Sequence, residues 1–225
     1  MRKILILTAT LLTPAIGLLA ATAQERLRDS AEVFHEIMAT PDKGIPQDLI
    51  AKAACVVIVP GLKKGAFIVG GQYGKGFAIC RREHAGWGPP AAVRVEGGSF
   101  GFQIGGSSTD VVMLIMNESG MRKLDRDKFT LGADASVAAG PVGRTAAAGT
   151  DAYMTAEILS WSRARGLFAG IALNGATLRP DMDDNKELYG ERLNSKEILM
   201  TNKPVPEAAR PLIGELDKYS MRKQG

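Results

Sequence analysis

The sequence contains few of the residues on which catalytic and metal sites depend, with two histidines and two cysteines among 225 residues. Structural zinc sites need four cysteine or histidine ligands at characteristic short spacings. Neither pair provides that spacing. The sequence therefore predicts no zinc site, and no pattern in it indicates a cofactor.

An excess of one charge is also lacking, since 28 lysines and arginines stand against 24 aspartates and glutamates, for a net charge of +4. Two of the basic residues, Arg2 and Lys3, belong to the extreme N-terminus. A chain so nearly neutral is not expected to bind nucleic acid in general, because that binding depends on many phosphate contacts. Any basic function must come from local clusters.

Long hydrophobic runs are absent except at the N-terminus, where residues 4–19 are apolar apart from Thr, Pro and Gly. Basic residues precede this run, and Ala21-Thr22-Ala23 follows it, as in a secretory signal peptide. A membrane anchor fits less well, because Pro14 and Gly17 interrupt the run. We expect cleavage after Ala23, export to the periplasm or cell envelope, and one mature domain over residues 24–225.

The two cysteines, Cys55 and Cys80, each lie in an apolar, strand-like run. In an exported protein they can form a disulfide, which would stabilise the fold by about 3 kcal/mol. They can equally be two small buried hydrophobic side chains. The sequence leaves both alternatives open, because pairing requires Cα atoms within about 7 Å.

Hydrophobic periodicity predicts an α+β fold, a single domain with a curved, mostly antiparallel, glycine-rich sheet packed with several helices. The expected helices are an amphipathic one over 24–40, a short one over 46–54, a buried one after Asp110, a short one capped by Asp184 and Glu187, and a C-terminal one from near Pro206. The expected strands lie within 55–60, 66–69, 76–80, 91–104, 129–139, 150–161 and 167–175.

The glycine-rich segment 97–106 contains the spacing G-x-S-x-G at Gly97, Ser99 and Gly101, which is typical of a hydrolase nucleophile elbow. An elbow needs a helix after the serine and a histidine later in the chain, yet both histidines precede Ser99. The sequence therefore favours Ser99 as a small residue in a glycine-rich strand. A serine hydrolase remains the alternative, because other triad orders and Ser-Lys dyads exist.

Two further segments resemble binding loops only in part. The segment 71–76 departs from a phosphate-binding loop at Val69, which stands in place of the first glycine, and at Gly76, so we expect a glycine hairpin between two strands. The segment 181–185 offers alternate oxygen ligands, but Lys186 and Arg192 replace the glycine and glutamate of an EF-hand. It is either a looser cation site or a solvated helix cap.

Basic residues recur at the ends of the short expected strands, and these are Lys63, Lys64, Lys75, Arg81 and Arg82. Alternate strand ends of a hairpin meet on one rim, so some of these side chains are expected to converge on an anionic headgroup. The N-terminal amphipathic helix would add apolar membrane contacts through Leu27, Phe34, Ile37 and Met38. Ordinary solubilising charge is the alternative.

Several glycine-rich blocks, in order, resemble the SYLF-domain family: residues 67–76, 97–106 followed by Thr109-Asp-Val-Val, 129–144, 166–170 and Tyr189-Gly190. The resemblance covers about residues 30–200. It implies a compact α+β domain that binds phosphoinositides or other anionic lipids with help from an N-terminal amphipathic helix. It also implies actin-binding relatives in yeast, and no enzymatic activity.

The leading hypothesis is therefore a non-enzymatic, exported lipid-binding protein that associates with anionic phospholipid or a membrane surface. A protein-interaction module of the cell envelope and a serine hydrolase acting through Ser99 are the alternatives.

Overall fold

The computed structural model describes residues 21–40, 44–66, 70–82, 86–99, 105–124, 126–142, 155–164, 167–171 and 173–220. Its helices are α1 (Ala23–Met38), α2 (Gln47–Lys52), α3 (Glu118–Leu124), α5 (Met182–Tyr189), α6 (Ser195–Leu199), the 3-10 turn η2 (Glu207–Ala209) and α7 (Arg210–Ser220). Its strands are β1 (Cys55–Ala66), β2 (Gly70–Arg82), β3 (Gly86–Trp87), β4 (Ala91–Ser99), β5 (Gly105–Ile115), β6 (Phe129–Thr130), β7 (Val137–Ala139), β8 (Ile158–Ala164), β9 (Leu167–Gly170) and β10 (Thr177–Pro180).

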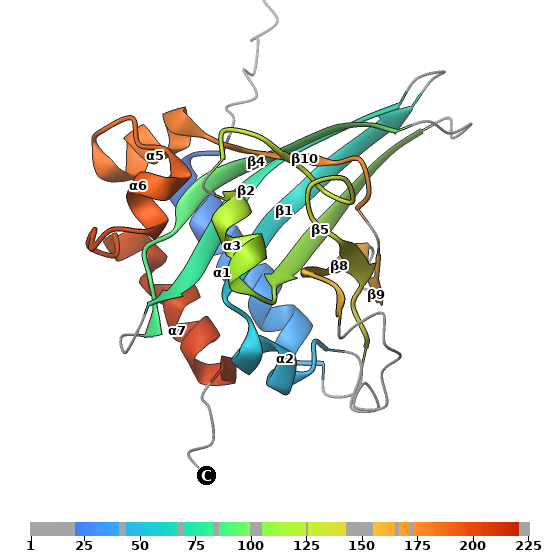
Figure 1. The fold of residues 1–225 in the computed structure, drawn as a ribbon, viewed down its shortest axis with the longest axis horizontal. Helices are drawn as coiled ribbons and strands as arrows, with labels where there is room; N and C mark the ends of the chain where they lie inside the picture. The colour runs from blue at the N-terminus through green and yellow to red at the C-terminus, as the bar shows by residue number, and fades with distance from the viewer. Residues whose placement is uncertain are drawn as a thin grey trace, which may run out of the picture.

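The strands form one curved sheet in the order β6-β10-β4-β2-β1-β5-β8-β7, to which β3 and β9 add at β2 and β8 (Figure 1). The described strand pairs are antiparallel, apart from the parallel pair of β7 with β8. Helices pack against both faces of the sheet. The predicted single α+β domain with a curved, mostly antiparallel sheet is therefore confirmed.

The first helix, α1, begins and ends within two residues of the predicted range. Thr22 caps it through a capping box, in which the Thr22 side chain accepts from the Glu25 N–H and the Glu25 carboxylate accepts from the Thr22 N–H. This arrangement satisfies two backbone donors at the helix start. The apolar face of α1 packs with α7 against one face of the sheet. No helix in the described ranges is both long and apolar enough to cross a bilayer.

The buried helix expected after Asp110 is wrong, because this segment is strand β5, and only the short α3 follows it. Along β5, Val112 and Leu114 face the core with α1, whereas Val111 and Met113 face the core on the other side of the sheet. A strand covered on both faces has a continuous apolar sequence, so its period resembles that of a buried helix.

The glycine hairpin expected over 71–76 is also wrong, because these residues lie inside strand β2. A Cβ atom at Gly76 would lie 1.9 Å from the Ile58 carbonyl oxygen of β1. Strand β1 has a register shift between Ile58 and Lys63, and Gly61 there has a φ of +58°. Glycine in β2 therefore lets the two strands approach closely beside a β-bulge.

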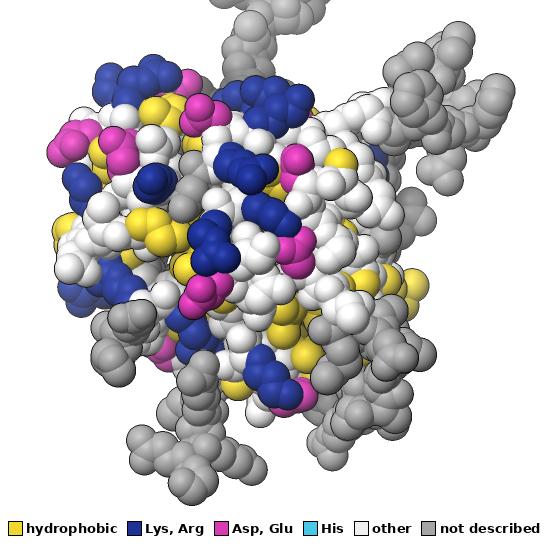
Figure 2. Space-filling view, viewed as in Figure 1, with side chains coloured by type: hydrophobic (Ala, Val, Ile, Leu, Met, Phe, Trp, Pro, Cys, Tyr) yellow, Lys and Arg dark blue, Asp and Glu magenta, His cyan; other side chains and the backbone are white. Residues whose placement is uncertain are grey.

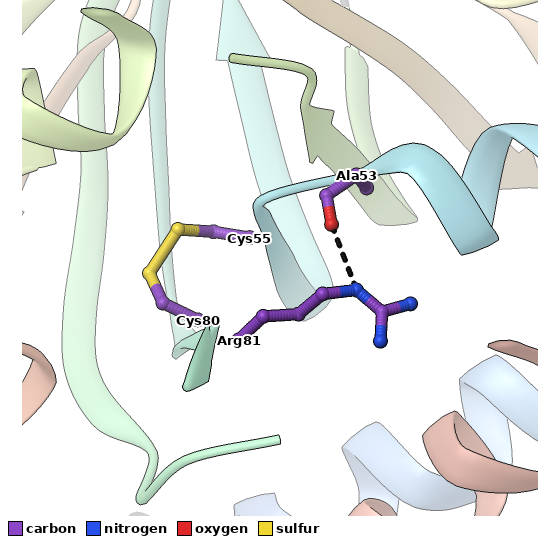
Figure 3. The surroundings of a disulfide bond; sticks show 4 residues. All are labelled: Ala53, Cys55, Cys80 and Arg81. Atoms are coloured by element: carbon purple, nitrogen blue, oxygen red, sulfur yellow. Dashed lines mark hydrogen bonds between the residues drawn. A yellow bond between two sulfur atoms is a disulfide. The ribbon is translucent and has the colours of Figure 1, made fainter. Parts of the chain in front are cut away.

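The two cysteines form a disulfide between β1 and β2, which decides between the two alternatives of the sequence (Figure 3). Cys55 and Cys80 are direct cross-strand partners with Cα atoms 4.0 Å apart. Both side chains are buried among the apolar residues of the sheet. The bond fastens the hairpin at the end that is packed against the helices.

Where the structure describes them, the remaining predicted elements agree with the sequence in kind and differ in their bounds, while 67–69, 100–104 and 150–154 of the predicted strands lie outside the described residues. The segment 129–139 holds two strands of two and three residues, β6 and β7, rather than one long strand. Strands β8 and β9 form the antiparallel hairpin expected around 163–166. Helix α5 is capped by Asp181, three residues before the expected cap. The C-terminal helix begins near Pro206, as predicted.

Candidate functional site

Lys75 belongs to a buried ionic cluster that joins three elements. Its Nζ lies 2.7 Å from Asp181 Oδ2 and 2.8 Å from Asp184 Oδ1 at the start of α5, and Arg26 of α1 pairs with Asp184 as well. Burial opposes the charge on Lys75, but the hydrogen bonds to both carboxylates outweigh it and raise its pKa above the ordinary value. Lys75 therefore holds the fold together rather than meeting a ligand.

The same cluster answers the question of a cation site at 181–185. Burial would raise the pKa of Asp181, but hydrogen bonds from Lys75 and from the Asp184 N–H keep it below its usual value. Asn185 is buried and bonds Ala92 N and Leu193 O. The carboxylates of Asp181 and Asp184 thus pair with Lys75 and Arg26, and Asp181 also caps α5. Within the described ranges, no cluster of three histidine, cysteine or acidic residues fits a metal ion.

Arg81 and Arg82 are likewise engaged at the disulfide end of the sheet. Arg81 Nε donates to the Ala53 carbonyl at 3.0 Å (Figure 3), and its guanidinium lies 4.2 Å from the Trp87 ring centroid. Arg82 donates to the carbonyl of Lys203, 121 residues further along the chain. These contacts fasten α2 and the C-terminal region to β2.

The four side chains expected to touch a membrane lie in the core instead. Leu27, Phe34, Ile37 and Met38 are at most 9% exposed and pack against the sheet and α7. The amphipathic pattern of α1 is therefore explained by its packing on the sheet, because a helix that covers a sheet needs one apolar face. In this structure that face is not available to a lipid surface.

Lys63 and Lys64 lie apart from Arg81 and Arg82, whereas Lys75 is two residues along β2 from the register partner of Lys63. Lys63 pairs in register with Tyr73 on β2, and Tyr73 is eight residues, or about 26 Å of strand, from Arg81. The single basic rim expected from the sequence is therefore wrong, since the continuous strands β1 and β2 separate its members. Figure 2 shows that Lys and Arg side chains on the visible face are interspersed with Asp and Glu.

Strands β1, β2, β4 and β5 continue together beyond the part of the sheet that the helices cover, toward the upper right of Figure 1. We call this end the blade. It comprises residues 63–66 of β1, 70–73 of β2, 97–99 of β4 and 105–108 of β5. Its described surface is largely white in Figure 2, because glycine and serine dominate its sequence. Lys63 and Tyr73 are exposed there, and Lys64 is half-buried.

One row of the blade consists of glycine on all four strands. Gly98, Gly71, Gly65 and Gly106 are successive partners across β4, β2, β1 and β5. All four are exposed, and a Cβ atom at any of them would meet no atom closer than 3.9 Å. None has a positive φ. Neither packing nor backbone conformation therefore requires glycine in this row.

Two carboxylates beside the blade, Glu96 and Asp110, are paired with arginines. Glu96, which is the register partner of Tyr73, pairs with Arg94 and Arg179. Asp110 accepts two hydrogen bonds from Arg163, at 3.0 and 2.8 Å, and one from the Gly61 N–H. Among the described residues, neither Lys63 nor Lys64 makes an ion pair of this kind. The blade therefore presents unneutralised positive charge.

The sequence did not reveal the cluster of Asp110, Arg163 and Glu36, which ties β5 and β8 to α1. Arg163 also lines a cleft of about 680 Å³ together with Phe168 and the exposed Leu167 of β9. Asp110 and Arg163 are register partners. Only the pairing of β5 with β8 brings them together, and the sequence predicts a helix for the segment that forms β5.

Ser99 does not occupy a nucleophile elbow. It ends strand β4 as the partner of Gly70, and the next described element is β5, a strand rather than a helix. His35, the histidine within the described ranges, lies on α1 with its Nδ1 3.1 Å from Glu215 of α7. Gly101, and the part of the motif that follows Ser99, lie outside the described residues. The geometry therefore offers no support for Ser99 as a nucleophile.

The fold and its polar clusters define an α+β domain whose ion pairs join its own elements and whose sheet projects one uncovered end. The chain belongs to the Ysc84 family, which carries the SYLF domain: the family's sequence model, described as "Las17-binding protein actin regulator", matches residues 96–219. That description names a regulator and no catalytic activity.

Several eukaryotic proteins are similar to this chain over most of its length. An SH3 domain-containing protein of Schizosaccharomyces pombe is 36% identical over 171 residues, which are 75% of this chain and 40% of that protein. Protein YSC84 of Saccharomyces cerevisiae is 32% identical over 179 residues, 78% of this chain and 38% of that protein. The human SH3 domain-containing YSC84-like protein 1 is 31% identical over 181 residues, 80% and 53% respectively. The chain thus spans 38% to 53% of the length of these relatives.

Proposed function

We propose that the protein is a non-enzymatic, exported lipid-binding protein that associates with anionic phospholipid headgroups at a membrane surface. The observation that carries this proposal is the exposed Lys63, beside Lys64, at an uncovered end of the sheet whose bordering carboxylates are paired with arginines. A lysine near an anionic surface contributes about 1 kcal/mol to binding. The resemblance to the SYLF-domain family supports the same class of ligand, anionic lipids.

Co-sedimentation with vesicles tests this function. The protein should bind vesicles of phosphatidylcholine mixed with phosphatidylglycerol more tightly than vesicles of phosphatidylcholine alone. The difference should shrink as salt is added, because salt screens exposed charges. Equal binding to both vesicles, or binding to neither, would contradict the proposal.

Export is the part of the proposal that rests on the leader pattern of residues 1–23, of which 1–20 lie outside the described residues. Mass spectrometry of protein isolated from its own cells would give the mature N-terminus. Thr22 caps α1 and Ala23 is the first residue of that helix, so cleavage after Ala23 would remove the capping box. A chain beginning at Gln24 should then be less stable than one beginning at Ala21 by about 1 kcal/mol.

A second candidate is a protein-interaction module of the cell envelope, which the family description "Las17-binding" favours. Affinity purification from an envelope extract distinguishes the two. Recovery of one stoichiometric protein, together with no binding to anionic vesicles, would favour this candidate over lipid binding.

A further inference from the structure

The glycine row of the blade is not explained by the fold. Glycine weakens a strand, because it has no side chain to pack and restricts the unfolded chain least. The row nevertheless combines room for a Cβ at each position with ordinary backbone angles and exposure to solvent. Glycine in such a place is typical of a surface where another molecule approaches the backbone closely.

The two lysines of the blade lie on opposite faces of the sheet, because successive side chains of a strand alternate. Lys63 shares its face with Tyr73 and Ser108, and Lys64 shares the other face with Gln72 and Ser107. A surface that met the blade flat would contact one lysine only. A surface that met it end-on would contact both at nearly the same depth.

The described residues of the blade carry charge of one sign only. Its residues include two lysines and no carboxylate, and the joining segments 67–69 and 100–104 are uncharged by sequence. Lys63 and Lys64 are adjacent on β1, so a surface that meets the blade end-on reaches both lysines together.

We propose that the blade enters the headgroup layer of an anionic phospholipid bilayer end-on, with Lys63 and Lys64 at the level of the phosphates. The glycine row lies nearer the bilayer than the lysines and lets headgroups close against the backbone of both faces. This inference rests on the proposed lipid-binding function and specifies its surface and orientation.

The described pairing limits how deep the blade can go. Pairing of β10 with β4 stops at Glu96, and pairing of β8 with β5 stops at Asp110. Beyond these residues, the outer edges of β4 and β5 have no described partner strand. Unpaired backbone groups are not tolerated in hydrocarbon, so the blade remains in the hydrated headgroup layer.

Charge removal at two places tests the surface. The double variant Lys63→Gln and Lys64→Gln should bind phosphatidylglycerol-containing vesicles about thirty-fold more weakly, from about 1 kcal/mol per lysine. The matched control, Lys52→Gln and Lys196→Gln, removes the same charge from exposed positions on α2 and α6. It should bind as tightly as the unaltered protein. Equal losses in both double variants would overturn the proposed surface.

A fluorescent reporter tests the orientation. The native Trp87 and Trp161 are buried, whereas Tyr73 is 48% exposed, so Tyr73→Trp adds one responsive indole. On anionic vesicles its emission should shift to the blue and be quenched by headgroup-labelled lipid more than by lipid labelled deep in the acyl chain. The control Leu167→Trp, at an exposed position on β9, should remain unchanged.

The outcomes separate this inference from the function on which it rests. If the unaltered protein does not bind anionic vesicles, the proposed function fails. If it binds but the indole at position 73 does not respond, or the one at position 167 does, the function stands and the end-on blade is wrong.

Discussion

Strands β1 and β2 carry glycines both in the blade and in the covered part of the sheet, and the two regions use them for opposite reasons. At the covered end, a Cβ at Gly76 would strike the Ile58 carbonyl and a Cβ at Gly74 would lie 2.8 Å from Leu62 Cδ1. In the blade, a Cβ at Gly65 would meet nothing within 4 Å. The same residue type is therefore imposed by packing at Gly74 and Gly76 and free of that constraint in the glycine row of the blade.

This difference shows that glycine content alone does not identify the purpose of a strand. In the covered half, side chains from both layers fill the space around the β1 bulge, so glycine is a condition of folding. In the glycine row of the blade, a larger residue would fit and would favour the strand. Substitutions in the two halves should therefore change different properties of the protein.

The largest expected effect is that of Gly76→Val, which places a branched side chain where the β1 backbone already lies. We expect the free energy of unfolding to fall by more than about 4 kcal/mol, or the protein not to fold, as measured by urea denaturation followed by circular dichroism. The matched substitution Gly71→Val in the blade should change it by less than about 1 kcal/mol. Similar losses in both variants would remove the distinction between the halves.

The next effect concerns Lys75, which lies on β2 between the two halves. Lys75→Met leaves the buried Asp181 without its cation and should cost about 3 kcal/mol at neutral pH. The pKa of Asp181 is held below its usual value, so this stabilisation is present above about pH 4 and is lost as the pH falls through the lowered pKa.

Urea denaturation across pH checks this prediction. The difference between Lys75→Met and the unaltered protein should shrink below about pH 4. Lys63→Met, at an exposed blade position, serves as the control and should leave the free energy of unfolding unchanged at every pH. A constant difference between Lys75→Met and the unaltered protein over the acid range would contradict the role of the ion pair.

The disulfide strengthens only the covered end of the β1–β2 hairpin. Cys55 and Cys80 are 25 residues apart, and the loss of such a closed loop should lower the free energy of unfolding by about 3 kcal/mol. Urea denaturation midpoints, measured in both the unfolding and the refolding direction with and without reductant, give this change in the free energy of unfolding. The variant Cys55→Ala and Cys80→Ala should not respond to reductant, and an unchanged midpoint for the fully reduced protein would refute the prediction.

The smallest expected effect on folding is in the glycine row. The double variant Gly65→Thr and Gly71→Thr should leave the free energy of unfolding unchanged or raise it by up to about 1 kcal/mol, because threonine favours strands. Its affinity for phosphatidylglycerol-containing vesicles should nevertheless fall, since side chains would keep headgroups from the backbone. Unaltered affinity would show that the row has no part in binding.

Most of the fold could be predicted from sequence periodicity, because α1, α2, α7 and the strand pattern depend on local sequence and burial on one side. The two main errors, β5 and the segment 71–76, involve strands whose neighbours decide their form. Val111–Ile115 is apolar on both faces, and Gly76 is explained only by the approach of Ile58. Such information lies in the partner strand and not in the segment itself.

The candidate site was predictable only in part. The sequence identified Lys63 and Lys64, but it grouped them with Lys75 and Arg81, which the structure assigns to the fold. The burial of Phe34 and the pairing of Asp181 with Lys75 depend on contacts between residues far apart in the chain. The same is true of the glycine row, which forms only when four strands come into register.

The outer edges of the blade, which have no described partner strand, affect whether the protein aggregates at high concentration. An exposed edge strand is a template on which a second copy can add a strand and begin an aggregate. Residues 97–99 and 105–108 consist of glycine and serine, which have little tendency to extend a sheet between molecules. The composition of these edge strands therefore limits self-association of the protein.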